Sequence, residues 1–267
     1  ERYHKEAWAS SDFFKNFFTP FNAEWLATFP DVIQGMALHQ LISQAVNDLS
    51  PADEYLQFCE ANKWLSDKEK QKSVISILVL YHTLRGNFDE ALRLAEADSQ
   101  TGLNRYGRMA IPLYFKGQHK LAGDYLEESV RQFRKDVGLR KGTLPNFQGI
   151  VHILAVLRQR DKEYLNSALK LVEETIQSPY SNLFSYLKSG LQFQLNDFTG
   201  AQQSLGPQPD TPIDWIFYAA AHYWNDMPLA VHGRVFLKNN YLAAAKHGYH
   251  WVEMELSTLL AIFEKEK

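Results

Sequence analysis

The 267-residue chain has a single cysteine, Cys59, so it cannot form a disulfide bond within itself. This scarcity is typical of proteins in a reducing compartment, and we predict a cytoplasmic location. The longest apolar runs, 74–84 and 150–157, are much shorter than the roughly 18 residues that suggest a membrane span. The chain starts with neither a methionine nor a signal-like apolar segment, so we interpret it as a piece of a longer protein.

The sequence also lacks a large excess of charge of either sign. Its formal net charge is −3 and its isoelectric point is near 6.3. Proteins that coat nucleic acid usually contain a strongly basic domain, so the overall balance disfavours that class but leaves room for one local basic face. Hydrophobic residues make up 45% of the chain, which is enough to bury a sizeable core.

Motifs with a strong catalytic mechanism are absent from the sequence. The segment 138–143, Gly-Leu-Arg-Lys-Gly-Thr, lacks the spacing with which a P-loop places its lysine on the terminal phosphates. The metalloprotease, nucleophile-elbow and dinucleotide-binding signatures are also missing. His247, His250 and Glu253 have a helical spacing that could converge on a metal, but paired helical histidines more often serve packing. We therefore predict a chain that is not an enzyme and has no cofactor or metal.

The hydrophobic pattern is helical throughout. In 165–176, apolar residues recur every three or four positions, whereas Lys170, Glu173 and Glu174 lie on the opposite side. Pro179 follows this segment and is expected to stop the helix. Strand-like alternation bounded by two-residue turns is not found, so we predict an all-α fold.

A short signature recurs at the expected junctions between helices. It consists of Gly or Asn, an aromatic residue or His two positions later, and Ala three positions after that. Copies occupy 86–91, 117–122, 196–201 and 239–244, with a degenerate copy at 164–168. Gly and Asn tolerate the left-handed conformation that ends a helix, the ring can fill the wedge between two antiparallel helices, and Ala permits their close approach.

The spacing of the first two copies indicates the repeat class. Gly86 and Gly117 are 31 residues apart, close to the roughly 34-residue period of tetratricopeptide (TPR) repeats. The period is irregular, so we predict a TPR-like α-α superhelix, a right-handed solenoid. Segment 74–84 is apolar nearly all round, as an inner helix would be, whereas 121–133 has one apolar stripe, as an outer helix would have.

We expect three regions: an N-terminal aromatic-rich helical segment or cap (1–65), TPR-like repeats (66–205) and C-terminal helices that continue the solenoid (206–267). We interpret the aromatic cluster of the first region as core or as a cap over the first repeat, since large apolar residues are usually buried; an exposed docking patch is the alternative. This cluster consists of Phe13, Phe14, Phe17, Phe18, Phe21 and Trp25.

A single C-terminal helix is predicted over 241–263. Its apolar residues follow a heptad seam, and Trp251, Leu260 and Ile262 lie off that seam. We predict that these three residues form a docking face for another domain of the same polypeptide, because the last helix of a solenoid has no following repeat to cover it. The alternative is that the preceding helices, through the bulky segment 215–224, cover both faces of this helix. The seam consists of Leu242, Ala245, Tyr249, Val252, Leu256, Leu259 and Phe263.

Five basic side chains crowd one predicted helix end and the loop that follows: Arg131, Arg134, Lys135, Arg140 and Lys141. Cations at a helix C-terminus interact favourably with its dipole, which is the simpler interpretation. The functional alternative is contact with nucleic-acid phosphates or with an acidic partner.

The same basic stretch opens a segment, Phe133 to Arg158, that resembles a stretch in large bacterial Swi/Snf-type helicase-like ATPases. In both, a helix ending in Phe-Arg-Lys or Leu-Arg-Lys is followed by a basic loop with Gly, a Leu-Pro turn and an apolar helix. The resemblance covers about residues 115–175, and this chain departs from it at Asn146-Phe-Gln before Gly149. It implies an accessory arm of a DNA-dependent motor, and it carries over no catalytic residue.

The sequence therefore predicts a non-catalytic helical-repeat scaffold or interaction domain, an accessory region of such an ATPase. Its expected partners are other domains of the same polypeptide, protein partners and, weakly, DNA, but no membrane. One alternative is a free-standing TPR-like module that binds peptides or proteins. Another is a ligand-sensing repeat domain of a signalling ATPase or transcription regulator, which a pocket lined by the aromatic segment 215–224 would favour.

If the basic stretch contacts DNA, affinity should be weak and should fall steeply with salt, because lysine and arginine contacts release counterions. Changing Arg134, Lys135, Arg140 and Lys141 together to Ser is expected to abolish binding, measured by fluorescence anisotropy of a labelled duplex at two salt concentrations. Binding that survives this change would show that the cluster is only a solvated helix end.

Overall fold

The structure is a computed structural model that describes residues 16–97, 103–137, 146–159, 162–175 and 181–265. All regular secondary structure in these ranges is helical, which confirms the predicted all-α class. The helices are α3 (Ala23–Ala27), α4 (Asp31–Asn47), α5 (Asp53–Ala61), α6 (Lys68–Leu84), α7 (Phe88–Ala97), α8 (Leu103–Phe115), α9 (His119–Val137), α10 (Asn146–Gln159), α11 (Lys162–Thr175), α12 (Ser181–Gln194), α13 (Phe198–Ser204), α14 (Pro212–Trp224), α15 (Val231–His247) and α16 (His250–Lys265).

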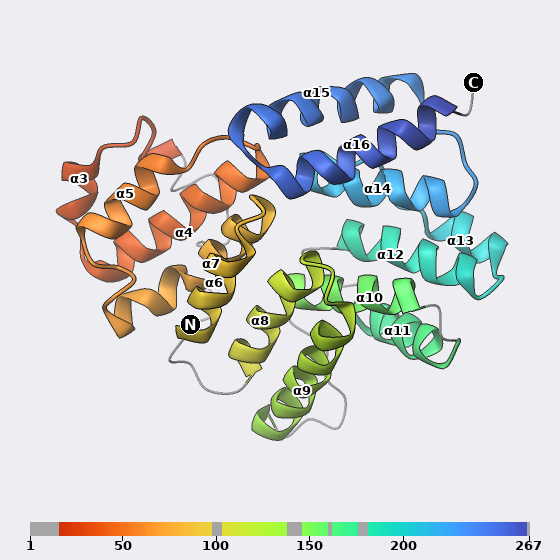
Figure 1. Ribbon diagram of the computed structural model, residues 1–267, viewed down its shortest axis with the longest axis horizontal. Coiled ribbons are helices and arrows are strands. Elements are labelled where there is room, and N and C mark those ends of the chain that lie inside the picture. Colours follow the sequence, from red (N-terminus) through yellow and green to blue (C-terminus); the bar gives the residue numbers. More distant parts are fainter. Residues whose placement is uncertain (1–15, 98–102, 138–145, 160–161, 176–180, 266–267) are drawn as a thin grey trace.

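The even-numbered helices from α4 to α16 form an inner layer. Each packs on the next even-numbered helix, and the odd-numbered helices α5 to α15 pack on the outside of their sequence neighbours. The inner layer curves until α16 contacts α6, so the helices α6 to α16 close into a ring (Figure 1). The inner position of α6 explains why it is apolar on nearly every side.

Most inner helices end in the same turn. A residue with positive φ follows α4, α6, α8, α12 and α14: Leu49, Gly86, Gly117, Asn196 and Asp226. In each turn the N–H of the next residue donates to a carbonyl five positions back, at 2.8–2.9 Å, which is the Schellman arrangement.

The predicted signature matches three of these turns. Its alanines at the first three copies, Ala91, Ala122 and Ala201, are fully buried where adjacent helices approach closely. The expected aromatic wedge is not formed everywhere. Phe198 is 52% exposed, and its ring meets that of Phe193 edge to face. The turn before the degenerate copy at 164–168 lies outside the described residues, but Ala168 is buried.

The fourth copy of the signature was wrongly assigned to a turn. Asn239 to Ala244 lies in the interior of α15, and the true turn comes earlier, at Asp226. Asparagine in a helix interior costs only a fraction of 1 kcal/mol relative to other polar residues, so packing decides whether it ends a helix.

The single helix predicted over 241–263 is also wrong. Gly248, with φ of 71°, ends α15, and α16 begins at His250 in a new direction. The heptad pattern is therefore divided between two helices. Leu242 is 55% exposed, whereas the heptad residues from Tyr249 to Phe263 are buried. Glycine makes this break inexpensive, because it adopts the left-handed region without a steric penalty.

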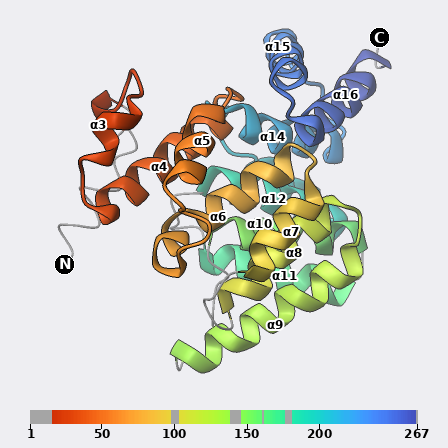
Figure 2. The ribbon, with the colours of Figure 1, turned by 60° about the vertical axis from the view of Figure 1, so that its left-hand side comes forward.

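The N-terminal region is more than a cap. Its α4 packs on α6 in the same way as the later inner helices pack on one another, while α3 lies at the far edge of the molecule (Figures 1 and 2). Of the aromatic cluster, Phe18 is buried, but Phe17 and Trp25 are 43% and 39% exposed. Phe13 and Phe14 lie outside the described residues.

A group of hydrogen bonds, called the seam from here on and distinct from the heptad pattern above, joins the turn between α15 and α16 to the end of α4. The Tyr249 hydroxyl donates to the carbonyl of Ser50 at 2.8 Å and lies 3.2 Å from that of Ala45. His247 Nδ1 lies 2.6 Å from the carbonyl oxygen of Leu49. Burial raises the pKa of Tyr249, which keeps its hydroxyl protonated as a donor. This seam fastens residues that are about 200 positions apart in the sequence.

Among the described helices, none combines the length and the apolar character needed to cross a lipid bilayer.

Removing the Tyr249 hydroxyl should weaken the seam. We expect Tyr249→Phe to lower the free energy of unfolding by about 1–2 kcal/mol, because a buried hydrogen bond is lost and a carbonyl loses its partner. Urea denaturation measures this change. Tyr164→Phe, which removes a hydroxyl from a 47% exposed ring, is the matched control and should be neutral. Equal stability of the two variants would contradict the role given to the seam.

Stability should also depend on His152 of α10, whose pKa burial lowers from 6.5 to about 4. Between these values the unfolded chain takes up a proton that the folded chain does not, so the stabilisation is present above pH 6.5 and is lost as the pH falls. We expect a loss on the order of 3 kcal/mol between pH 6.5 and 4 from this group.

The measurement is urea denaturation at several pH values in the wild type, in His152→Leu and in His232→Leu, a control that changes an exposed histidine at the start of α15. Only His152→Leu should flatten the pH dependence. An unchanged slope in that variant would refute this assignment.

Candidate functional site

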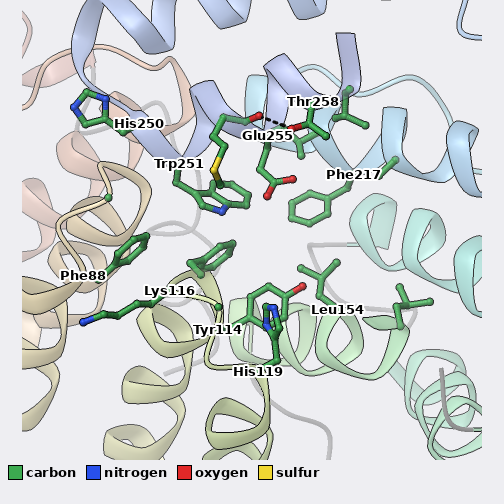
Figure 3. Close-up of a pocket in the computed structure, with 18 of the residues that line it drawn as sticks. Phe88, Tyr114, Lys116, His119, Leu154, Phe217, His250, Trp251, Glu255 and Thr258 are labelled. Carbon is green, nitrogen blue, oxygen red and sulfur yellow. Dashed lines mark hydrogen bonds between the residues drawn. The ribbon is translucent and has the colours of Figure 1, made fainter. Parts of the chain in front are cut away.

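A cavity of about 1150 Å³ occupies the centre of the ring (Figure 3). Its wall comes from the turn after α6, the start of α7, the end of α8, the start of α9, α10, the end of α12, and α14 and α16. No single repeat could form this space, because its lining residues are spread from Arg85 to Ile262. The cavity is therefore a product of ring closure.

Aromatic side chains make up much of the wall. The rings of Tyr114, Phe217 and Trp251 extend from α8, α14 and α16 toward one common space (Figure 3). Trp251 is held in place by Phe115, whose ring centroid is 4.4 Å away at an interplanar angle of 73°. Further rings in the lining are Phe88, Tyr223 and Trp224.

One carboxylate belongs to the lining. Glu255, one helical turn after Trp251, extends into the same space between Trp251 and Phe217 (Figure 3). Two neutral polar lining residues use hydrogen-bond donors within the protein. The Thr258 hydroxyl donates to the carbonyl of Met254 at 2.9 Å, and Gln194 Nε2 donates to that of Leu157 at 3.1 Å.

Basic side chains line the part of the cavity nearest the ends of α6 and α8. Lys116 Nζ lies 2.7 Å from a carboxylate oxygen of Asp89. Arg85 donates to the Tyr81 hydroxyl at 2.9 Å, and its guanidinium lies 5.4 Å from the centroid of the same ring. These two cations thus have partners within the chain.

Helix ends of both polarities meet at the cavity. The lining includes the last residues of α8, α12 and α14, namely Phe115, Gln194 and Trp224, and the first residues of α7, α9 and α16, namely Phe88, His119 and His250. The partial charges of these helix ends have opposite signs, so together they favour neither a cation nor an anion.

The three residues whose spacing could converge on a metal, His247, His250 and Glu253, are divided between two helices. His247 ends α15 and faces the carbonyl of Leu49, whereas His250 begins α16 beside Glu253, at 3.5 Å. The turn at Gly248 separates them, so the i, i+3, i+6 spacing does not lie on one helix. Within the described residues, no group of three or more His, Cys, Asp or Glu side chains could hold a metal.

The basic residues predicted to contact DNA are only partly described. Arg131 on α9 forms an ion pair with Glu128 at 2.7 Å, and Lys135 is exposed on the same helix. Arg140 and Lys141 lie outside the described residues, as does the side chain of Arg134. Contact with DNA stays a prediction.

The residues predicted to dock another domain lie elsewhere than expected. Trp251 is buried against Phe115, Ile262 lines the cavity, and Leu260 is half-buried against the core. Closure of the ring turns this part of α16 inward, so the three residues do not form one open outer face. A pocket lined by the aromatic segment 215–224 was only the condition that would favour the ligand-sensing alternative, and Tyr114 and Glu255 carried no signal of their own.

Comparison with known proteins gives no relative from which to transfer a function: no protein family, curated protein or solved structure matches the chain.

Proposed function

We propose that this chain is a non-catalytic helical-repeat module that binds a small organic molecule in its central cavity. The observation that carries the proposal is the concave aromatic wall contributed by α8, α14 and α16. Binding pockets are typically concave and mostly apolar, with a few polar groups that orient the ligand. The cavity has this composition.

The size of the cavity indicates the size of the ligand. Pockets for drug-sized molecules have volumes of roughly 300–1000 Å³, and this cavity, at about 1150 Å³, lies just above that range. It is too large to be an ordinary packing defect, since protein interiors contain few voids larger than a water molecule.

The segment 215–224 favours the sensor alternative over the peptide-binding one. Ile216, Phe217, Ala220, Tyr223 and Trp224 line the cavity. An inner surface that binds extended peptides would instead be expected to present Asn, Lys and Arg side chains along its inner helices, whereas α6 and α10 are mainly apolar.

We also propose that the repeat is TPR-like and that the module serves as an accessory arm of a larger ATPase. The alternation of inner and outer helices and the recurring Schellman turns support the first part. A ligand that stabilises the closed ring would allow such an arm to report the presence of that ligand to neighbouring domains.

Filling the cavity should block binding. An uncharged environment-sensitive dye, N-phenyl-1-naphthylamine, is expected to bind the wild type with a rise in fluorescence, and Ala220→Trp should lose most of this binding because the indole occupies the space. Ala245→Trp places the same side chain on the exposed face of α15 and is the matched control.

Circular dichroism must first show that both variants keep the wild-type helicity. Equal dye binding by the two tryptophan variants would mean that the dye binds outside the cavity and would sink the proposal.

A further inference from the structure

We propose that the ligand is an organic cation whose alkylated ammonium group lies among Tyr114, Phe217 and Trp251, beside Glu255. This inference rests on the proposed function, since it names the chemistry of the molecule that the central cavity binds. The juxtaposition that supports it is three aromatic rings and one carboxylate around a single space (Figure 3).

The aromatic rings provide the first attraction. The face of an aromatic ring carries partial negative charge, so a cation within about 6 Å of the centroid is attracted, most strongly by tryptophan. Tyr114, Phe217 and Trp251 belong to three different inner helices, so they surround a ligand instead of offering a single flat surface. A methylated ammonium suits such walls because its outer surface is apolar and it carries few or no N–H groups to satisfy.

Glu255 provides the second attraction. A carboxylate has two oxygens and about four acceptor positions, so it can hold a ligand in addition to contacts within the chain. In a partly apolar cavity, an ionised carboxylate and a cation attract each other more strongly than in water. Glu255 would therefore select the sign of the ligand charge, while the rings select its apolar surface.

The helix ends around the cavity do not add to this preference. The C-terminal ends of α8, α12 and α14 reach the lining, but so do the first residues of α7, α9 and α16, namely Phe88, His119 and His250. Partial charges of both signs therefore face the cavity, and the rings and Glu255 carry the selection.

The basic lining residues Arg85, Lys116, His119 and His250 would repel a cation when charged, so their positions matter. His119 begins α9, and its ring centroid lies 4.9 Å from that of Tyr114. Lys116 is paired with Asp89, and Arg85 is bound to Tyr81 and lies over the Tyr249 ring at 5.9 Å as well. The His250 side chain is 71% exposed and lies at the edge of the lining, away from Glu255 (Figure 3). The acidic part of the cavity is thus on the middle of α16, and the basic part is near the ends of α6 and α8.

The test uses two probes of nearly the same shape, 3-hydroxyphenyltrimethylammonium and its uncharged counterpart 3-tert-butylphenol. Calorimetric titration gives the dissociation constant of each. We expect the cation to bind about tenfold more tightly than the phenol, as cation–π and ion-pair contacts would produce together.

Variants of Glu255 identify its role. Glu255→Gln should remove the preference for the cation while leaving phenol binding unchanged, and Glu255→Asp should retain part of the preference. Glu253→Gln removes a carboxylate two positions away, on another side of α16, that does not line the cavity, and it should behave as the wild type. Thermal unfolding of each variant shows whether a loss of binding reflects a loss of folding.

The outcomes separate the two proposals. Equal binding of cation and phenol, or tighter binding of 3-tert-butylbenzoate than of either, would overturn the cation assignment while leaving a ligand-binding cavity in place. If neither probe binds and the naphthalene dye fails as well, the proposed function itself is wrong. A Glu255→Gln variant that keeps the full preference would also refute the assignment.

The inferred group could belong to a free molecule or to a trimethylated lysine of a protein. We expect a free molecule, because the space lies at the centre of the ring and is lined by α7, α8, α9, α10, α12, α14 and α16. A short peptide carrying trimethyl-lysine is the second arm of the titration. Tighter binding of the peptide than of the free cation would overturn this choice of source but retain the chemistry.

Discussion

The contact between the α15–α16 turn and the end of α4 is the constraint on which the central cavity depends. Through Tyr249 and His247, this turn binds carbonyl groups that the left-handed turn after α4 leaves available. The same contact sets the direction of α16 and brings it against α6. Without it, α16 would keep its packing on α14 and α15 but lose its hydrogen-bonded attachment to the end of α4, which would weaken the closure of the ring around the cavity.

The seam and the cavity share residues, which links their energetics. Arg85 lies over Tyr249 at the seam and also belongs to the lining, and His250 adjoins both. Gly86 and Gly248 allow the two turns to approach: a side chain at Gly248 would come within 2.9 Å of the Arg85 guanidinium. A ligand that contacts both α8 and α16 would therefore stabilise the closed ring, because it adds contacts that exist only in that arrangement.

The repeat is maintained by backbone geometry more than by a fixed set of residues. Glycine occupies the left-handed position after α6 and α8, but Leu49, Asn196 and Asp226 occupy it after α4, α12 and α14. A leucine or aspartate with positive φ is less favourable than glycine, and tertiary packing compensates for the difference. Leu49 is fully buried, which supplies such compensation at the first turn.

Sequence periodicity alone determined the helical class, the inner position of 74–84 and three of the turns, because these follow from local residue spacing and from the tolerance of Gly and Asn for left-handed backbone. Sequence periodicity gave wrong predictions where packing overrides local preference. Asn239 is helical inside α15, and the turn after α14 has Asp226, not glycine, in the left-handed position. The apolar spacing does not reveal the helix break at Gly248, because it continues across that residue.

The candidate site depended on tertiary structure almost entirely. The sequence shows that segment 215–224 is rich in aromatic residues but does not place a pocket there. The opposite walls of the cavity, Tyr114 and Trp251, are separated by 137 positions in the sequence and come together only when the ring closes. Trp251 and Ile262 accordingly face the cavity and not an outer surface. A linear pattern reports which face of a helix is apolar, whereas the partner of that face is decided by the long-range contacts that close the ring.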